Sequence, residues 1–177
     1  MNQYIKSDLF RYRGNTSWSS FIKEFLCHHA FRYMCAHRLL NSKGIEKWGG
    51  AVIWFFLNKN YIQIPLETKI GYGFYIGHGG PVIINGTVII GNNCNISQFT
   101  TIGANEGKAA VIGDNVYIGP NVCIVEDVLI KDNVTIGAGS VVCKNLPENA
   151  TVAGNYAKVL NFNNPGRYIE NRWNINS

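Results

Sequence analysis

The sequence predicts a mainly β protein, a parallel β-helix of hexapeptide repeats that follows a short N-terminal helical segment. Three observations lead to this prediction. A β-branched aliphatic residue recurs every six residues from Ile64, glycine often follows it, and the first 60 residues lack this repeat but space their apolar residues as a helix does. We expect a helical segment over residues 1–60, a β-helix over 61–160 and a tail over 161–177.

The hexapeptide repeat runs from Ile64 to Val142, with two extra residues before Ile90 and a longer insertion before Ile112. Neither a helical period nor simple alternation spaces apolar residues in this way. In a β-helix each hexad is a short strand and a corner, so three hexads make one triangular coil and we expect about four coils. The first position is filled by Ile64, Ile70, Ile76, Val82, Ile90, Ile96, Ile102, Ile112, Ile118, Ile124, Ile130, Ile136 and Val142.

The first 60 residues favour helices that cap the open end of the β-helix. One amphipathic helix is expected to begin near Ser17. Gly49 and Gly50 are expected to interrupt the helical pattern before a second helix, in which the apolar run 51–57 forms a buried face. The tail after Asn161 is rich in asparagine and aromatic residues, and it either packs along the β-helix or a neighbour or is mobile.

Charge and cysteine content limit the partners and the cellular location. Nine of the sixteen Lys and Arg residues lie in the first 60 positions, which suits anionic small molecules or anionic lipid headgroups, but without a basic run nucleic acid is disfavoured. Five cysteines without a Cys-x-x-Cys motif indicate reduced thiols and a cytoplasmic location. No apolar run reaches the roughly 20 residues of a membrane span, so only peripheral membrane contact stays open.

His78 is the one histidine in the repeat, and the fold does not require it. Hexads three apart share a face, so we expect His78, Gln98, Pro120 and Ala138 to form an outward column. The insertion at 103–111 is expected to overhang this column and to make a cleft beside His78. Because the other histidines lie in the helical segment, a zinc site made of coil histidines is disfavoured and no metal is expected.

The sequence resembles the hexapeptide-repeat acyltransferases, specifically their serine acetyltransferase-like branch, and is similar to polysaccharide O-acetyltransferases. The resemblance covers nearly the whole chain and rests on the stretches SDLFRYRG, YIQIPLETKIGYGFYIGHGG, GNNCNISQFTTIG and AGNYAKVL. It implies left-handed coils, acetyl-CoA as co-substrate, and a homotrimer with sites between its subunits. It also implies acetyl transfer to a hydroxyl with His78 as the general base, since a hydroxyl is a poor nucleophile until it loses its proton.

The resemblance also implies which residues contact the two substrates. The path of coenzyme A toward the C-terminal coils would pass backbone positions and end at two lysines that meet its phosphates. These cofactor-binding residues are Ala104, Gly119, Ala138, Gly139, Lys144 and Lys158. The acceptor side would be formed by Gln63, Gly77, Gly79, Gln98 and Lys108.

Departures from the biosynthetic serine acetyltransferases bear on the acceptor. Gln63 stands where that family has an Asp that orients the histidine, and Gly77 stands where an Asp helps to hold the serine amine. The loop motif Asp-Arg-His-Pro falls on Gly-Lys-Ala-Ala at 107–110. We therefore expect a sugar hydroxyl, in surface polysaccharide assembly, as the main acceptor, with serine as the alternative and a non-catalytic scaffold as the third hypothesis.

Overall fold

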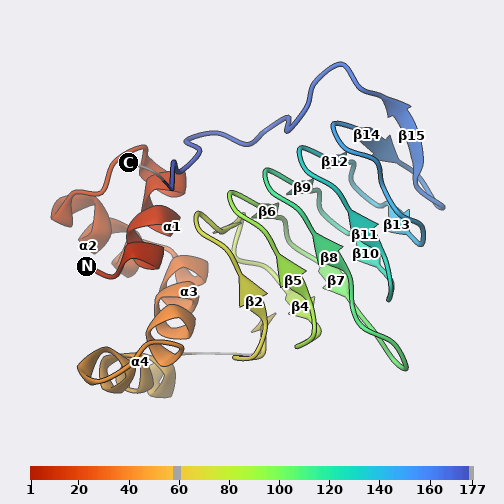
Figure 1. The fold of residues 1–177 in the computed structure, drawn as a ribbon. Coiled ribbons are helices and arrows are strands. Elements are labelled where there is room, and N and C mark those ends of the chain that lie inside the picture. Colours follow the sequence, from red (N-terminus) through yellow and green to blue (C-terminus); the bar gives the residue numbers. More distant parts are fainter. Residues whose placement is uncertain (58–60, 176–177) are drawn as a thin grey trace.

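A computed structural model describes residues 1–57 and 61–175. Helices occupy the N-terminal part of these residues, and short strands wound into a prism follow (Figure 1). The helices are α1 (Gln3–Arg13), α2 (Trp18–Cys27), α3 (His29–Leu40) and α4 (Ile45–Phe56). The strands are β1 (Ile62–Gln63), β2 (Lys69–Ile70), β3 (Tyr75–Ile76), β4 (Val82–Ile84), β5 (Ile89–Ile90), β6 (Asn95–Ile96), β7 (Thr100–Ile102), β8 (Val111–Ile112), β9 (Tyr117–Ile118), β10 (Cys123–Ile124), β11 (Leu129–Ile130), β12 (Thr135–Ile136), β13 (Val141–Val142), β14 (Thr151–Ala153) and β15 (Lys158–Asn161).

The strands form three parallel sheets, which are the faces of a triangular prism. Face A has the order β1-β4-β7-β10-β13, and face B has the order β11-β8-β5-β2. Face C runs β14-β12-β9-β6-β3, and β15 pairs with β14 in the antiparallel direction. Faces A and C therefore each hold five parallel strands within the described residues, so there are five coils and not about four. The sequence prediction counts too few coils, because it counts hexads only from Ile64 to Val142. Strand β1 precedes Ile64 and β14 follows Val142, and both belong to the coils.

The repeated aliphatic positions form the core inside the prism. All thirteen side chains are buried, and the most exposed of them, Ile70, has only 8% of its surface accessible. Small or β-branched residues fill the positions between them, among them Val116, Val122 and Val134, each fully buried. The six-residue period therefore predicts the core correctly.

The helical segment differs from the sequence prediction in two respects. The predicted cap residue Ser17 does begin α2, where its side chain accepts a hydrogen bond from the Ser20 amide, but a break at His28 separates α2 from α3. Gly49 and Gly50 lie inside α4, so the predicted interruption there is wrong. The reason is packing, since a Cβ on Gly50 would lie 2.8 Å from the Leu39 Cβ of α3. Glycine lets the two helices approach closely.

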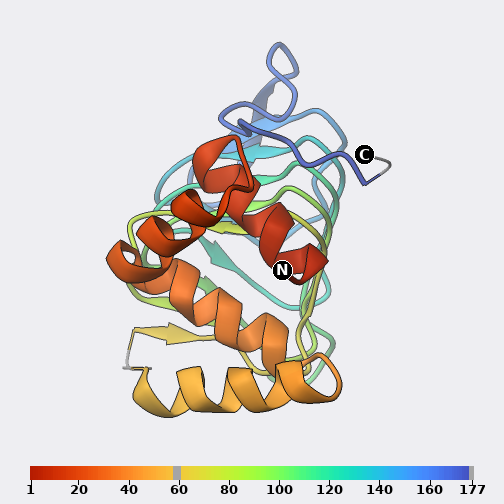
Figure 2. The same cartoon turned by 90° about the vertical axis from the view of Figure 1, so that its left-hand side faces the viewer.

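Helices α1 and α3 lie across the end of the prism at the first coil (Figure 2). Their side chains form hydrogen bonds with backbone groups at the open edge of this coil. Unpaired strand edges of this kind are costly when buried and promote aggregation when exposed. The helices therefore act as a cap, as the sequence predicted. The hydrogen bonds join Tyr33 to Ile64, His37 to Pro65, Arg38 to Ile70 and Gly71, Ser7 and Arg11 to Gly73, Asp8 to Phe74, and Tyr12 to Ile76.

The C-terminal tail packs along the prism and returns to the helical end (Figure 1). The Trp173 amide donates to Asn93 Oδ1 at 2.7 Å, and Arg11 Nε donates to the Glu170 carbonyl at 2.7 Å. The Phe10 and Trp173 rings meet edge to face at 5.7 Å. Of the alternatives that the sequence left open, the structure shows packing along the β-helix.

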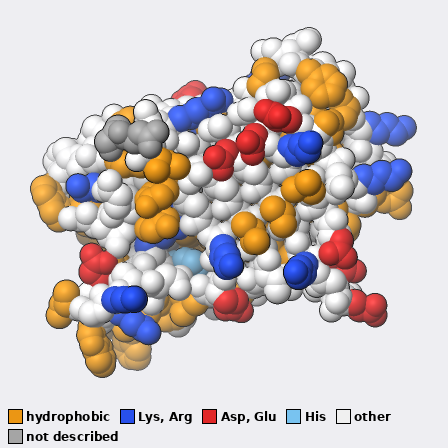
Figure 3. Space-filling view, viewed as in Figure 1, with side chains coloured by type: hydrophobic (Ala, Val, Ile, Leu, Met, Phe, Trp, Pro, Cys, Tyr) orange, Lys and Arg blue, Asp and Glu red, His pale blue; other side chains and the backbone are white. Residues whose placement is uncertain are grey.

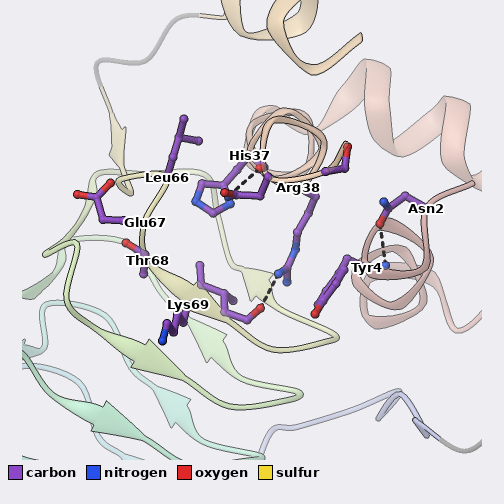
Figure 4. Close-up of a pocket in the computed structure, with 11 residues that line it drawn as sticks. Asn2, Tyr4, His37, Arg38, Leu66, Glu67, Thr68 and Lys69 are labelled. Atoms are coloured by element: carbon purple, nitrogen blue, oxygen red, sulfur yellow. Dashed lines mark hydrogen bonds between the residues drawn. The ribbon is translucent and has the colours of Figure 1, made fainter. Parts of the chain in front are cut away.

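His37 makes the stability of the cap depend on pH. Burial lowers the pKa of His37, and its Nε2 lies 3.1 Å from the Pro65 carbonyl beside a pocket of about 450 Å³ (Figure 4). The unfolded chain therefore binds a proton more readily than the folded chain does. The free energy of unfolding should fall as pH drops below about 6.5, toward the lowered pKa. The variant His37→Gln keeps a donor for the Pro65 carbonyl but cannot titrate. In urea titrations at several pH values, its free energy of unfolding should depend less on pH than that of wild type. An equal pH dependence in the two proteins would show that His37 is not the cause.

Candidate active site at the His78 corner

His78 lies at the corner between β3 and β4, where face C turns into face A. Its side chain is exposed, and its φ of 61° is in the left-handed region. Gly79 follows with a φ of 59°. The left-handed region costs a non-glycine residue roughly 1–2 kcal/mol, but nine other non-glycine residues of the described chain also have a positive φ, so this conformation is a regular feature of the coil corners and is not specific to His78.

The His78 corner is two residues longer than the corner above it. Ile76 pairs with Ile96 before the corner, whereas Val82 pairs with Thr100 after it, so a step of six residues lies opposite a step of four. A Cβ on Gly80 would lie 2.6 Å from the Gln98 Cβ, so Gln98 stacks on Gly80. His78 and Gly79 are therefore the extra pair, which we call the corner bulge.

The corner bulge corrects two sequence predictions. The six-residue period places the two extra residues before Ile90, but the strand pairing puts them at His78 and Gly79. Gln98 was expected directly above His78, but it stacks on Gly80. The period alone does not locate an insertion between two strands, because Val82 and Ile84 are both aliphatic and both buried.

The helical cap positions the corner bulge from two sides. On one side, the Tyr12 hydroxyl of α1 donates to the Ile76 carbonyl at 3.0 Å and accepts from the Ile76 amide at 3.2 Å, which holds the strand that leads to His78. On the other side, a Cβ on Gly79 would lie 4.0 Å from the Ala30 amide nitrogen in the first turn of α3. The partial positive charge of a helix N-terminus favours negative charge nearby. Sequence reasoning missed Tyr12 and Ala30, because no pattern shows which strand a helix will contact.

The predicted site residues divide between two edges of the prism. The edge between faces C and A, here called the CA edge, carries the corner bulge, Gln98, Gly119 and the exposed pair Ala138 and Gly139. Gly77 precedes the bulge and donates its amide to the Ile96 carbonyl at 2.8 Å. Lys158, in β15, lies opposite Ala153 of face C.

The edge between faces A and B, here called the AB edge, carries the other predicted residues. Ala104 and Lys108 lie in the loop between β7 and β8, and Lys144 follows β13. Ala104 lines a pocket of about 300 Å³ together with Cys123 and Glu126. The expected overhang of this loop above His78 is therefore not found within one chain, because the corner that follows the Gln98 hexad is the next one around the coil.

The loop on the AB edge is held by one carboxylate. Glu126 Oε2 accepts hydrogen bonds from the amides of Asn105, Glu106 and Gly107 at 2.8, 3.1 and 3.1 Å. These backbone bonds lower the pKa of Glu126. The loop therefore has a defined shape next to the Ala104 pocket.

Gln63 and the acids of the cap offer His78 no carboxylate partner. Gln63 is exposed on β1 opposite Ile83, and no hydrogen bond joins it to His78 in the described part of the chain. Glu24 is buried with 2% of its side chain exposed and is paired with Arg13 at 2.8 Å. Within residues 1–57 and 61–175, no group of three or more His, Cys, Asp or Glu side chains is arranged to hold a metal ion.

The sequence of this chain is similar to the sequences of known proteins. Residues 109–144 match the family described as bacterial transferase hexapeptide (six repeats). A serine acetyltransferase of Staphylococcus aureus (strain Mu50) is 35% identical over 133 residues, which are 72% of this chain and 61% of the relative. The chain thus carries the hexapeptide repeat of these transferases, and its sequence is similar to those of serine acetyltransferases. It spans about three fifths of the length of the curated relatives that it matches first.

Solved structures of serine acetyltransferases have a fold similar to that of this chain. The serine acetyltransferase of Neisseria gonorrhoeae in complex with serine has a TM-score of 0.71 at 28% identity, over 88% of this chain and 67% of that one. The serine acetyltransferase of Brucella abortus in complex with coenzyme A has a TM-score of 0.67 at 24% identity, over 88% and 65%, and it shows the shared fold alone. The predicted left-handed parallel β-helix with short N-terminal helices is confirmed.

Proposed function

We propose that this chain is an acetyl-CoA-dependent O-acetyltransferase in which His78 is the general base. The observation that carries the proposal is the corner bulge, a two-residue insertion that presents the one histidine of the repeat as an exposed side chain on the CA edge. The relatives named serine acetyltransferases support the reaction class.

The chemistry follows from the exposed imidazole. His78 takes the proton of the acceptor hydroxyl as its oxygen attacks the thioester carbonyl, and it returns the proton to the sulfur of coenzyme A when the carbon–sulfur bond breaks. The oxyanion formed in between needs donors that are already in place. The amides of the bulge and the N-terminus of α3 near Ala30 are the donors that lie next to His78.

The acceptor that the comparisons favour is L-serine. The relatives carry this activity in their names, and the Neisseria enzyme was solved with serine. They do not support the sugar hydroxyl that the sequence analysis placed first. One observation keeps the sugar as a second candidate: Gln63 and Gly77 offer no carboxylate to a serine ammonium group, and Glu24 is committed to Arg13.

The two edges of the prism suggest a site that two subunits share. His78 lies on the CA edge, whereas Ala104 and Lys108 lie on the AB edge, with the whole of face A between them. A coenzyme A molecule that contacts both sets needs the CA edge of one chain and the AB edge of another. A homotrimer, as the sequence resemblance implies, supplies this pairing three times. A cytoplasmic location stays a prediction.

The test of the acceptor is thiol release from acetyl-CoA with L-serine and, in parallel, a panel of sugars. The expected result is thiol release that depends on L-serine. Turnover on a sugar with none on serine would select the second candidate. An absence of both turnover and acetyl-CoA binding would contradict the proposal and favour the non-catalytic scaffold.

A further inference from the structure

The solvent-facing side of α4 is apolar, which is unusual for a surface helix. Its side chains Ile45, Trp48, Val52, Phe55 and Phe56 are 86%, 75%, 60%, 79% and 80% exposed. The run 51–57, predicted to be buried, is therefore largely on the surface. Gly50 faces inward against α3, and the side chains that bond the first coil come from α1 and α3. The apolar face of α4 thus has no role in closing the prism.

Helix α2 continues this surface. Trp18, Ile22 and Leu26 form a stripe at four-residue spacing and are 65%, 55% and 68% exposed. A pocket of about 340 Å³ lies between the two helices and is lined by Phe25, Arg32, Val52, Ile53, Phe56 and Leu57. We call the exposed residues of α2 and α4 together the helical-end face. Hydrophobic side chains gather at this end of the molecule, to the left and lower left in Figure 3.

The charges around the helical-end face are basic. Residues 1–57 hold eight Lys and Arg residues against three Asp and Glu residues, an excess that equals the net charge of +5 of the whole chain. All three acids are engaged, Asp8 with Arg38, Glu24 with Arg13, and Glu46 with the Asn2 amide group. The cations Lys23, Lys43 and Lys47 are exposed.

We infer that the helical-end face docks on an anionic lipid surface. Aromatic and aliphatic side chains beside lysines are the composition of helices that lie in the headgroup region of a bilayer. No helix of the described residues is long and apolar enough to cross a membrane, so the contact is peripheral. A second copy of the chain is a poorer occupant, because a twofold contact would set the lysines of one copy against those of the other.

Docking brings the corner bulge close to the lipid surface. His78 lies in the first coils, and Gly79 adjoins the first turn of α3, the helix that packs against α4. The inference does not depend on the acceptor, because its readout is binding and not turnover.

The experiment is co-sedimentation of the full chain with vesicles. Vesicles of phosphatidylcholine that contain phosphatidylglycerol should bind the chain, vesicles of phosphatidylcholine alone should bind it much less, and added salt should weaken binding. The double variant Trp48→Ser/Phe55→Ser should lose binding. Its matched control is Leu160→Ser/Phe162→Ser, which replaces side chains that are 61% and 53% exposed at the other end of the prism and should bind as wild type.

A charge variant distinguishes electrostatic attraction to anionic lipid from nonspecific hydrophobic adsorption. Lys43→Glu/Lys47→Glu should weaken binding by at least about fivefold for each lysine, with an unchanged circular dichroism spectrum. The inference is overturned if the chain stays in solution with anionic vesicles, if it binds both kinds of vesicle equally, or if the helix variants bind as wild type. It is also overturned if Trp48→Ser/Phe55→Ser dissolves a larger assembly instead, because a second copy then covers the face.

Discussion

Replacement of His78 by alanine should lower kcat for acetyl transfer by about 10²- to 10⁴-fold, the contribution of a positioned general base. The β-helix should keep its stability, because the side chain is exposed and makes no hydrogen bond within the described residues. Alanine is also no better suited than histidine to a φ of 61°. The measurement is the rate of thiol release at saturating substrates, next to thermal unfolding of the same samples.

Glycine at position 78 sharpens this test. His78→Gly should be as inactive as the alanine variant but more stable than wild type by up to about 1 kcal/mol, because glycine adopts the left-handed region without strain. Asn121→Gly is the matched control, since Asn121 also has a positive φ of 57° but lies in a corner without an insertion. It should gain stability and keep its activity. If His78→Ala retained activity within about tenfold of wild type, the general-base assignment would be wrong.

Replacement of Asp8 by alanine should destabilise the chain by about 3–5 kcal/mol, as the loss of one partner from a buried ion pair does. Asp8 receives two hydrogen bonds from Arg38, at 2.9 and 3.1 Å, and one from the Phe74 amide at 2.8 Å. Arg38 also donates to the Ile70 and Gly71 carbonyls at 2.7 and 2.6 Å. Without Asp8 the guanidinium group is buried without a counter-charge, and the first coil loses part of its cap.

The measurement is the free energy of unfolding from urea titrations. Glu67→Ala is a suitable control, because Glu67 is an exposed acid next to the same cap and should change stability by less than about 0.5 kcal/mol. Asp8→Asn should lie between the two, since an amide keeps the shape and can accept one of the hydrogen bonds. Equal stability of Asp8→Ala and Glu67→Ala would show that the cap does not hold the first coil.

The core was predictable from the sequence because a β-branched aliphatic residue recurs every six residues and faces inward, with a second buried position between successive repeats. All thirteen predicted positions are buried, although Ile84 and not Val82 is the residue in register with Ile102. The helical segment was less predictable, since Gly49 and Gly50 usually interrupt a helix, but here Gly50 permits the contact between α3 and α4. The apolar face of α4 looked like a core face, because hydrophobicity does not reveal which side of a helix has a partner.

The candidate site was only partly predictable. His78 stood out because the repeat has no use for an imidazole, and the structure places it on a bulge. The position of the bulge depends on strand pairing, Val82 with Thr100, which the period does not show. The 103–111 loop lies apart from His78 because it occupies the next corner around the coil, on the AB edge and not on the CA edge. The contacts of Tyr12 with Ile76 and of Ala30 with Gly79 arise from tertiary packing, for which the sequence holds no local signal.

The most direct test of general-base catalysis by His78 follows the acetyl group itself. Acetyl-CoA labelled in its acetyl group is incubated with the wild-type chain and either L-serine or one sugar of the panel, and in matched reactions with His78→Ala. We expect label on the hydroxyl of the acceptor with the wild-type chain and almost none with the variant. Label that stays on coenzyme A with serine and with every sugar tested, although the chain binds acetyl-CoA, would contradict this expectation.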